Sequence, residues 1–292
     1  MNVVFLSEIK MNKLVICTGA AWFFAPKTII CLLCWLLLAI GAFAQEITYD
    51  IISATGKIID TSSGKELQVG DRVSLQTVFQ FNSLHDRAVL LNPDKAKFFL
   101  ELPNSSFVNA QMSVASHLAL TPVKTRPALI TGVRGSSVMV AKGVSPQSLK
   151  EYFAIDTFTV VGAKFTLPVT RQDARKFDLL LRYENGNTVE EYISTDFTIS
   201  KNDLKIQGNR ISECFVLLKE GNTTIPVTQM SLFFVDREQL FEEFHSLLNA
   251  LHQNRDDKNT VRDILRHYCT DIYGTIDDRA LEKVINDYLT MK

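Results

Sequence analysis

The sequence predicts a mainly β protein of the α+β class that ends in an α-helical segment. Short runs rich in β-branched and aromatic residues, separated by Gly, Pro and Asn, fill the N-terminal third and recur later in the chain. Beyond Asp236 the apolar residues change to helical spacing. We therefore expect a small β barrel or sandwich over 45–106, a basic connector over 107–150, an antiparallel β domain over 151–235 and a three-helix cap over 236–292.

Residues 1–44 are predicted to be a signal peptide. Lys27 precedes an uncharged apolar run from Thr28 to Ala44, which ends in the small-x-small sequence Ala42-Phe43-Ala44. Cleavage is expected between Ala44 and Gln45, which predicts a periplasmic or secreted protein. Two alternatives stay open: an uncleaved N-terminal anchor, and a true start at Met11.

The segment after the leader reads as a series of short strands. Runs such as "ITYDIISATGKIID", "TVFQF" and "KAKFFLEL" are broken at Gly70-Asp71 and at Asn92-Pro93-Asp94. Five or six strands in so short a stretch indicate a small barrel or a compact sandwich. We expect Gly70 to hold a turn and to matter for folding.

Four features of this segment resemble the FecR-type domain of exported Gram-negative envelope proteins. They are Gly56, "LQVGDRV" at 67–73, "AVLL" at 88–91 and "FFLELPNSS" at 98–106; one step departs, since "FQFNSLHDR" lacks the usual glycine. The resemblance implies a scaffold that senses or contacts an envelope partner. A rival likeness, from "GKIIDTSSGKELQVGD", is to the carboxypeptidase-regulatory β domain, which implies the same fold class and no catalysis.

The expected connector is basic. Between Glu101 and Glu151 there is no Asp or Glu, while the segment carries Lys124, Arg126, Arg134, Lys142 and Lys150. This pattern fits either a surface for an anionic glycan, a lipid headgroup or an acidic partner, or a solvated linker that complements the following acidic segment.

The second β region contains two hairpin signals. Glu184-Asn185-Gly186-Asn187 and Lys219-Glu220-Gly221-Asn222 each separate two strand-like runs, and Asn-Gly between alternating runs is a strong hairpin signal. We therefore expect an antiparallel sheet or sandwich here.

Three amphipathic helices are expected at the C-terminus. Asp236 with Gln239 resembles a capping box, and Thr260 and Thr275 each stand three residues before an Asp. Gly274 is expected to end the middle helix in a left-handed conformation. The acidic pairs Glu242-Glu243 and Asp277-Asp278 are interpreted as first-turn charges that complement the helix dipole.

Few residues suggest chemistry. Cys214 and Cys269 are interpreted either as a disulfide or as two buried thiols, in preference to a dyad of Cys269 with His267. His245 and His252 lie two helical turns apart, too far to share a metal ion. Residues 271–282 lack the ligand pattern of an EF-hand. No cofactor is expected.

These observations predict a non-catalytic binding or scaffolding protein of the bacterial cell envelope, with an envelope protein or a surface glycan as its partner. The chain has 31 basic and 32 acidic residues, a balance that argues against nucleic-acid binding. One alternative is a hydrolase that gathers His85 or His117 with carboxylates and a nucleophile. Another is a structural subunit of a surface assembly, which an exposed apolar edge strand would support.

Overall fold

The computed structural model describes residues 47–83, 86–102, 111–113, 120–123, 143–153, 157–185, 188–206, 208–253 and 257–291. Residues 47–292 form one compact unit, and the predicted α+β class is confirmed. The leader, with the expected cleavage site at Ala44–Gln45, lies outside the described residues. Among the described helices, none combines the length and the apolar character needed to cross a membrane.

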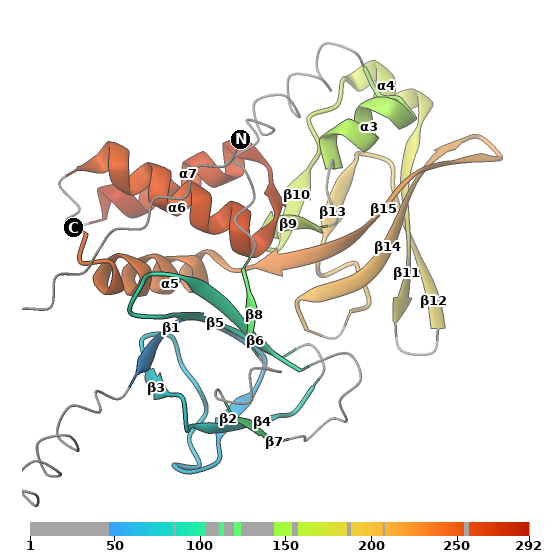
Figure 1. Cartoon of the computed structure of the whole chain (residues 1–292). Helices are drawn as coiled ribbons and strands as arrows, with labels where there is room; N and C mark the ends of the chain where they lie inside the picture. The colour runs from blue at the N-terminus through green and yellow to red at the C-terminus, as the bar shows by residue number, and fades with distance from the viewer. Residues whose placement is uncertain are drawn as a thin grey trace, which may run out of the picture. The chain divides into compact units, whose positions relative to one another are not determined.

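The N-terminal module consists of two antiparallel sheets. The first has the order β3-β1-β5-β6-β8 and the second the order β2-β4-β7 (Figure 1). Their strands are β1 (Thr48–Thr55), β2 (Ile58–Asp60), β3 (Arg72–Ser74), β4 (Val78–Phe81), β5 (Arg87–Leu91), β6 (Lys97–Glu101), β7 (Gln111–Ser113) and β8 (Leu120–Pro122). Strands β7 and β8 come from the expected connector, so part of that segment belongs to the sheets.

Strand β5 is buried on both faces, which explains its unbroken apolar run. Ala88 and Leu90 pack in the core between the two N-terminal sheets, whereas Val89 and Leu91 pack in a second core with the C-terminal helices. A strand that faces water on one side alternates apolar and polar residues, and a strand covered on both sides does not. The N-terminal module and the helical cap therefore share a core.

The sequence predicts an antiparallel sheet in this region, but the central sheet is mixed. Its order is β12-β11-β14-β15-β9-β16, and β9 pairs in parallel with both β15 and β16. The bounds are β9 (Thr157–Val161), β11 (Asp178–Asn185), β12 (Thr188–Ser194), β14 (Arg210–Glu220), β15 (Thr223–Val235) and β16 (Thr275–Ile276). Strand β16 lies between helices α6 and α7 in the chain, so a long connection separates it from its parallel partner β9. Local sequence patterns do not reveal such long-range pairing.

Smaller elements complete the central part. They are a two-stranded sheet of β10 (Lys164–Thr166) and β13 (Thr198–Ser200), and the helices α3 (Pro146–Phe153) and α4 (Arg171–Lys176). Leu149, Tyr152 and Phe153 of α3 are buried in the core of the central sheet. This helix begins inside the expected connector, so the last residues of that segment belong to the central part of the fold.

Both predicted hairpins are confirmed. Strands β11 and β12 pair antiparallel with Asn185 opposite Thr188, and β14 pairs with β15 with Glu220 opposite Thr223. The second hairpin turns at Gly221-Asn222, between the paired ends, and Gly221 has a φ of 57°.

The three predicted helices are present as α5 (Arg237–Ala250), α6 (Lys258–Tyr273) and α7 (Asp278–Thr290), but the expected N-terminal caps of α6 and α7 are wrong. Asp236 makes no side-chain cap in α5. Asp257 caps α6 and Asp277 caps α7, because in each case a carboxylate accepts from free first-turn N–H groups. Gly274 follows α6 with a φ of 74°, the positive φ expected of it.

Candidate functional site

Strand β12 forms an open edge of the central sheet. Among the described strands it pairs with β11 alone. In the ladder, Glu191 lies opposite Arg182, and Arg182 lies opposite Phe215 of β14. Because alternate residues of a strand share a face, Val189 and Ile193 lie on the same face as Phe215. We call these three residues the β12 surface.

The β12 surface exposes large apolar side chains. Val189 is 63% exposed, Ile193 47% and Phe215 41%, and they make up three of the five exposed large hydrophobic residues in the described part of the chain. The opposite face of the same strands buries Leu181, Val216 and other residues of the central core. Apolar side chains gathered on one exposed face are typical of a protein-binding surface.

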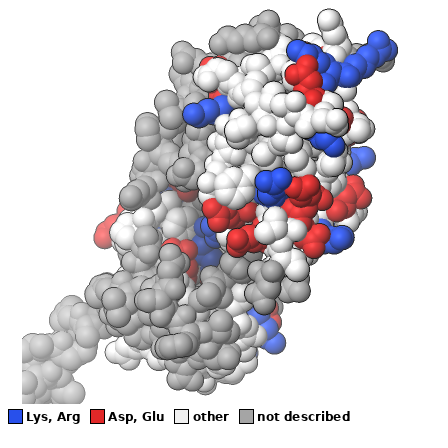
Figure 2. All heavy atoms as spheres, turned by 90° about the vertical axis from the view of Figure 1, so that its right-hand side faces the viewer, with Lys and Arg blue, Asp and Glu red and all other residues white. Residues whose placement is uncertain are grey.

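Charged side chains lie beside these apolar residues. On the same face Arg182 forms an ion pair with Glu191 at 2.7 Å, and on the opposite face of β12 Lys205 pairs with Glu190 at 3.3 Å. Figure 2, which shows the side of the molecule at the right of Figure 1, has acidic and basic side chains interleaved over this face. Exposed ion pairs add little stability, so these charges bear more on the choice of partner than on folding.

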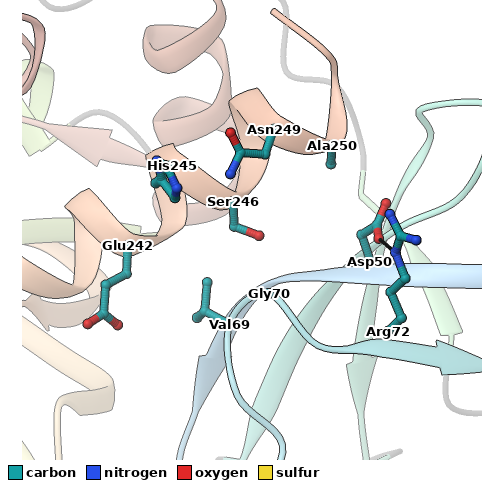
Figure 3. Close-up of a pocket in the computed structure, with 9 residues that line it drawn as sticks. All are labelled: Asp50, Val69, Gly70, Arg72, Glu242, His245, Ser246, Asn249 and Ala250. Atoms are coloured by element: carbon teal, nitrogen blue, oxygen red, sulfur yellow. Dashed lines mark hydrogen bonds and ion pairs between the residues drawn. The ribbon is translucent and has the colours of Figure 1, made fainter.

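A cavity of about 330 Å³, which we call the α5 pocket, separates helix α5 from the turn before β3. Helix α5 contributes one wall and strands β1 and β3 with their turn contribute the other (Figure 3). Asp50 and Arg72 form an ion pair at 2.8 Å on the strand side. The lining residues are Asp50, Val69, Gly70, Arg72, Glu242, His245, Ser246, Asn249 and Ala250. Groups of both charges therefore line the α5 pocket, so its lining is better suited to a polar, uncharged molecule than to a charged one.

The turn at Gly70 is joined to helix α5 through one carbonyl group. Gly70 N and Ser246 Oγ both donate to Ile51 O, at 2.8 Å and 3.1 Å. In return Ile51 N donates to Asp71 O at 2.8 Å, and Gln68 N donates to Asp71 Oδ2 at 2.8 Å. The Gly-Asp pair that the sequence singles out thus holds strand β1 in register and supports α5.

We expect Gly70→Val to destabilise the protein by about 1–3 kcal/mol. Gly70 has a φ of 92°, and an added Cβ would meet nothing within 4 Å, so the cost comes from backbone strain alone. Urea unfolding of the two proteins measures the difference. An unchanged midpoint would show that the turn relaxes to an ordinary conformation.

A polar cluster beneath this region is centred on the buried side chain of Glu243. Its Oε1 accepts from Ser53 Oγ at 2.7 Å and from Gln239 Nε2 at 2.9 Å. Its Oε2 accepts from Tyr268 OH at 2.9 Å, and Tyr273 OH lies 2.7 Å and 2.6 Å from the two oxygens. We call this the Glu243 junction, because it joins β1 to α5 and α6.

The interpretation of Glu243 as a first-turn charge is wrong. Helix α5 begins at Arg237, and Glu243 falls on the apolar stripe between Leu240 and Leu247, where helical periodicity turns it inward. The spacing of Glu243 from Leu240 and Leu247 is the feature of the sequence that indicates its burial. The sequence does not show the four donors, because they come from β1, α5 and α6.

Stability should depend on pH through Glu243. Burial raises the pKa of Glu243 above its ordinary value of 4.5, and the hydrogen bonds from Tyr273, Gln239, Ser53 and Tyr268 oppose this rise. The unfolded chain therefore loses this proton at lower pH than the folded protein, and stability falls as pH rises through that interval. We expect the unfolding free energy of the wild type, relative to Glu243→Gln, to decrease as the pH rises from about 4, where a glutamate in the unfolded chain begins to lose its proton. A difference that stays constant or grows with pH would contradict this assignment.

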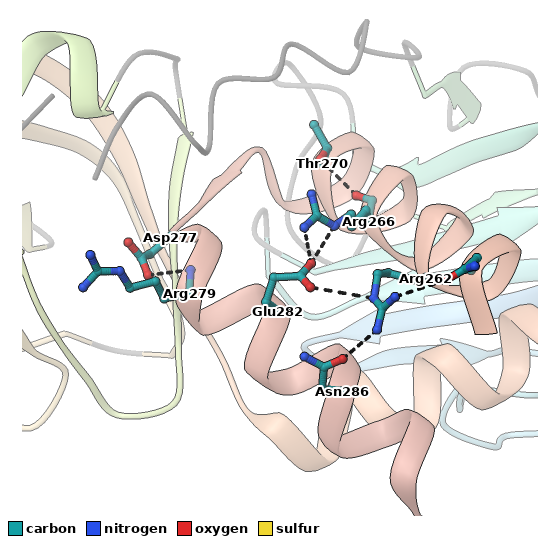
Figure 4. A network of polar contacts seen from close by, with 8 residues as sticks. Arg262, Arg266, Thr270, Asp277, Arg279, Glu282 and Asn286 are labelled. Atoms are coloured by element: carbon teal, nitrogen blue, oxygen red, sulfur yellow. Dashed lines mark hydrogen bonds and ion pairs between the residues drawn. The ribbon is translucent and has the colours of Figure 1, made fainter. Parts of the chain in front are cut away.

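Helices α6 and α7 are joined by a polar network on their outer side (Figure 4). Arg266 Nε donates to Glu282 Oε1 at 2.6 Å, and Arg262 Nη2 donates to Asn286 Oδ1 at 2.9 Å. Its members are partly exposed, so the network aligns the helices more than it stabilises them. Among the described residues no group of three His, Cys, Asp or Glu side chains could hold a metal ion.

Of the two interpretations of the cysteines, the structure fits two buried thiols, because Cys214 and Cys269 are free and lie in different cores. Cys214 lies in the core of the central sheet, and Cys269 lies among the C-terminal helices. Burial raises the pKa of Cys214 to about 12 and the pKa of Cys269 well above its ordinary value. Both thiols are thus held protonated, so neither is an activated nucleophile.

We expect both thiols to resist alkylation in the native protein and to react after denaturation without a reductant. Mass mapping of the peptides that contain Cys214 and Cys269 separates them from the leader cysteines. Recovery of these two peptides joined to each other and unmodified would show that Cys214 and Cys269 form a disulfide.

The three described histidines do not assemble into a site. His245 lines the α5 pocket, and His252 follows the end of α5 with a φ of 53°. His267 Nδ1 lies 2.7 Å from the carbonyl oxygen of Asp263 in its own helix. His85 and His117, which the hydrolase alternative requires, lie outside the described residues.

Comparison of the chain with protein-family models, with curated proteins and with solved structures finds no match.

Proposed function

We propose that this chain is an exported, non-catalytic binding or scaffolding protein of the bacterial cell envelope, and that it holds a protein partner on the β12 surface. The apolar leader and the FecR-like features of the N-terminal module motivate the location. The observation that carries the binding role is the open edge of β12 with Val189, Ile193 and Phe215 exposed beside it.

The chemistry of the edge favours a partner with a basic, partly apolar extended segment. Strand β12 has the sequence TVEEYIS, with two acids and no basic residue. A segment that pairs with its free edge gains backbone hydrogen bonds along the strand, and basic side chains on it complement Glu190 and Glu191.

A second copy of the chain fits this edge less well. Antiparallel pairing of the whole of β12 with another β12 would place Glu191 opposite Glu191 of that copy. Like charges directly opposite each other destabilise a sheet. This argues against the structural-subunit alternative, although the open apolar edge is the feature that would favour it.

Retention of envelope proteins by three forms of the immobilised chain tests the proposal. We expect the wild type to retain a specific protein and Val189→Ser/Ile193→Ser to lose most of it. Met291→Ser removes a 57% exposed apolar side chain far along the sequence and serves as the control; it should retain the partner. Equal retention by all three forms would remove the β12 surface from the proposal, and retention of the chain itself would favour the structural subunit.

A further inference from the structure

A second cavity, of about 100 Å³, lies between the N-terminal sheet, the central sheet and the end of α6. Two arginines from distant parts of the chain, Arg87 of β5 and Arg210 of β14, both line it. We call it the arginine cavity. Its lining residues are Arg87, Phe99, Thr157, Thr159, Arg210 and Phe233, with residues 271–274 of the α6 end.

The Arg87 guanidinium is held in place by an aromatic ring. The Arg87 guanidinium carbon lies 4.6 Å from the centre of the Phe99 ring, a cation–π arrangement that fixes its plane. Arg210 begins β14 and lies opposite Phe233 of β15. Glu101 is the cross-strand neighbour of Arg87. In the described part of the chain neither arginine forms an ion pair or a hydrogen bond.

The charge of Arg87 also acts on Arg210. Burial and the charge of Arg87 lower the pKa of Arg210 from its ordinary value, and Glu101 opposes this shift. Asp271, the acid in the lining, is bound by Lys97 at 2.6 Å. A pair of partly buried guanidinium groups is costly unless an anion offsets their repulsion and desolvation.

The end of helix α6 does not account for the arginines. A helix C-terminus attracts cations through its free carbonyl groups. Here Thr159 Oγ1 donates to Tyr273 O at 2.6 Å, and Gly274 N donates to Thr270 O at 3.2 Å. These carbonyl groups have their own donors, and the guanidinium groups are left facing the cavity.

We propose that the arginine cavity binds a phosphate group, either the free ion or the phosphate of a larger envelope molecule. The fork of N–H donors on each arginine matches the oxygens of a phosphate, and a dianion neutralises both charges at once. The Thr157 side chain adds a hydroxyl to the lining. The small volume suits a compact head group and excludes a nucleoside inside the cavity. This site is independent of the β12 surface, so either proposal can fail alone.

Thermal unfolding of the full chain in increasing inorganic phosphate, with chloride used to keep the ionic strength constant, tests the proposal. Phosphate also stabilises proteins without a site, so the variants decide. We expect a saturable rise of the midpoint in the wild type and in Arg182→Gln, which loses a surface arginine. In Arg210→Gln and in Arg87→Gln the apparent affinity should fall about tenfold or more.

Both Arg210→Gln and Arg87→Gln are measured, so that the experiment still decides if one of them does not fold. No saturable rise in the wild type, or the same rise in every form, would overturn the proposal. A parallel titration with sn-glycerol 3-phosphate distinguishes the sources. Binding of the ester as tight as that of the ion, and lost in the same variants, assigns the phosphate of a larger molecule, whereas binding of inorganic phosphate alone assigns the free ion.

Discussion

Replacement of Glu243 by alanine should destabilise the protein by about 3–5 kcal/mol. The carboxyl group is fully buried and accepts hydrogen bonds from side chains of β1, α5 and α6. Removing it leaves the hydroxyl groups of Ser53, Tyr268 and Tyr273 without their acceptor, and each unpaired buried donor costs about 1–3 kcal/mol. The cavity left behind adds to the loss.

Glu242→Ala provides the matched control. Glu242 precedes Glu243 in the same helix but is exposed, so its loss should change the unfolding free energy by about 0.5 kcal/mol or less. Urea unfolding of the three proteins at one pH measures both effects. Similar losses in the two variants would mean that the Glu243 junction contributes little to stability.

Gly56→Ala should be comparably damaging, with a loss of about 3–5 kcal/mol. Gly56 has a φ of 81°, and an added Cβ would lie 2.0 Å from Asp86 Oδ1 and 3.1 Å from Asp86 Cα. Asp86 cannot easily move away, because its Oδ2 accepts from Asn82 N and Ser83 N, each at 2.7 Å. The substitution therefore combines backbone strain with a steric clash.

Gly64→Ala separates these two contributions. Gly64 has a similar φ of 67°, but an added Cβ would meet nothing within 4 Å. This variant should lose only about 1 kcal/mol. If thermal unfolding gave both alanine variants the same midpoint, the close approach of Asp86 to Gly56 would have no energetic consequence.

The sequence predicts the fold class and the local elements well, because these depend on short-range patterns. The strand runs, both hairpins and all three C-terminal helices were visible in periodicity and turn residues. The parallel pairing of β9 with β15 and β16 was not, because β16 is two residues long and its partner lies more than a hundred residues earlier. The N-terminal caps of α6 and α7 were missed because Thr260 and Thr275, close to Asp257 and Asp277, fit a capping pattern as well.

The candidate sites were much less predictable. Gly70 was identified as a turn, but nothing near it in the sequence showed that helix α5 would form the other wall of a pocket. Arg87 and Arg210 are more than a hundred residues apart and belong to no motif, so only the pairing of the strands brings them to one cavity. The spacing of Val189 and Ile193 is that of any half-buried strand, so it does not reveal that they are exposed. Their exposure follows from the place of β12 at the edge of the sheet.

The hydrogen bond between Ser53 and Glu243 spans 190 positions along the chain, and this has a consequence for how the protein reaches its native state. Contacts between distant segments slow folding, since a long loop must close before they form. Because a chain is synthesised from its N-terminus, strands β1 and β5 emerge well before the helices that cover their second face. Their apolar side chains, Val89 and Leu91 among them, remain uncovered until α5, α6 and α7 arrive. The last part of the chain to be delivered thus completes the core of the first.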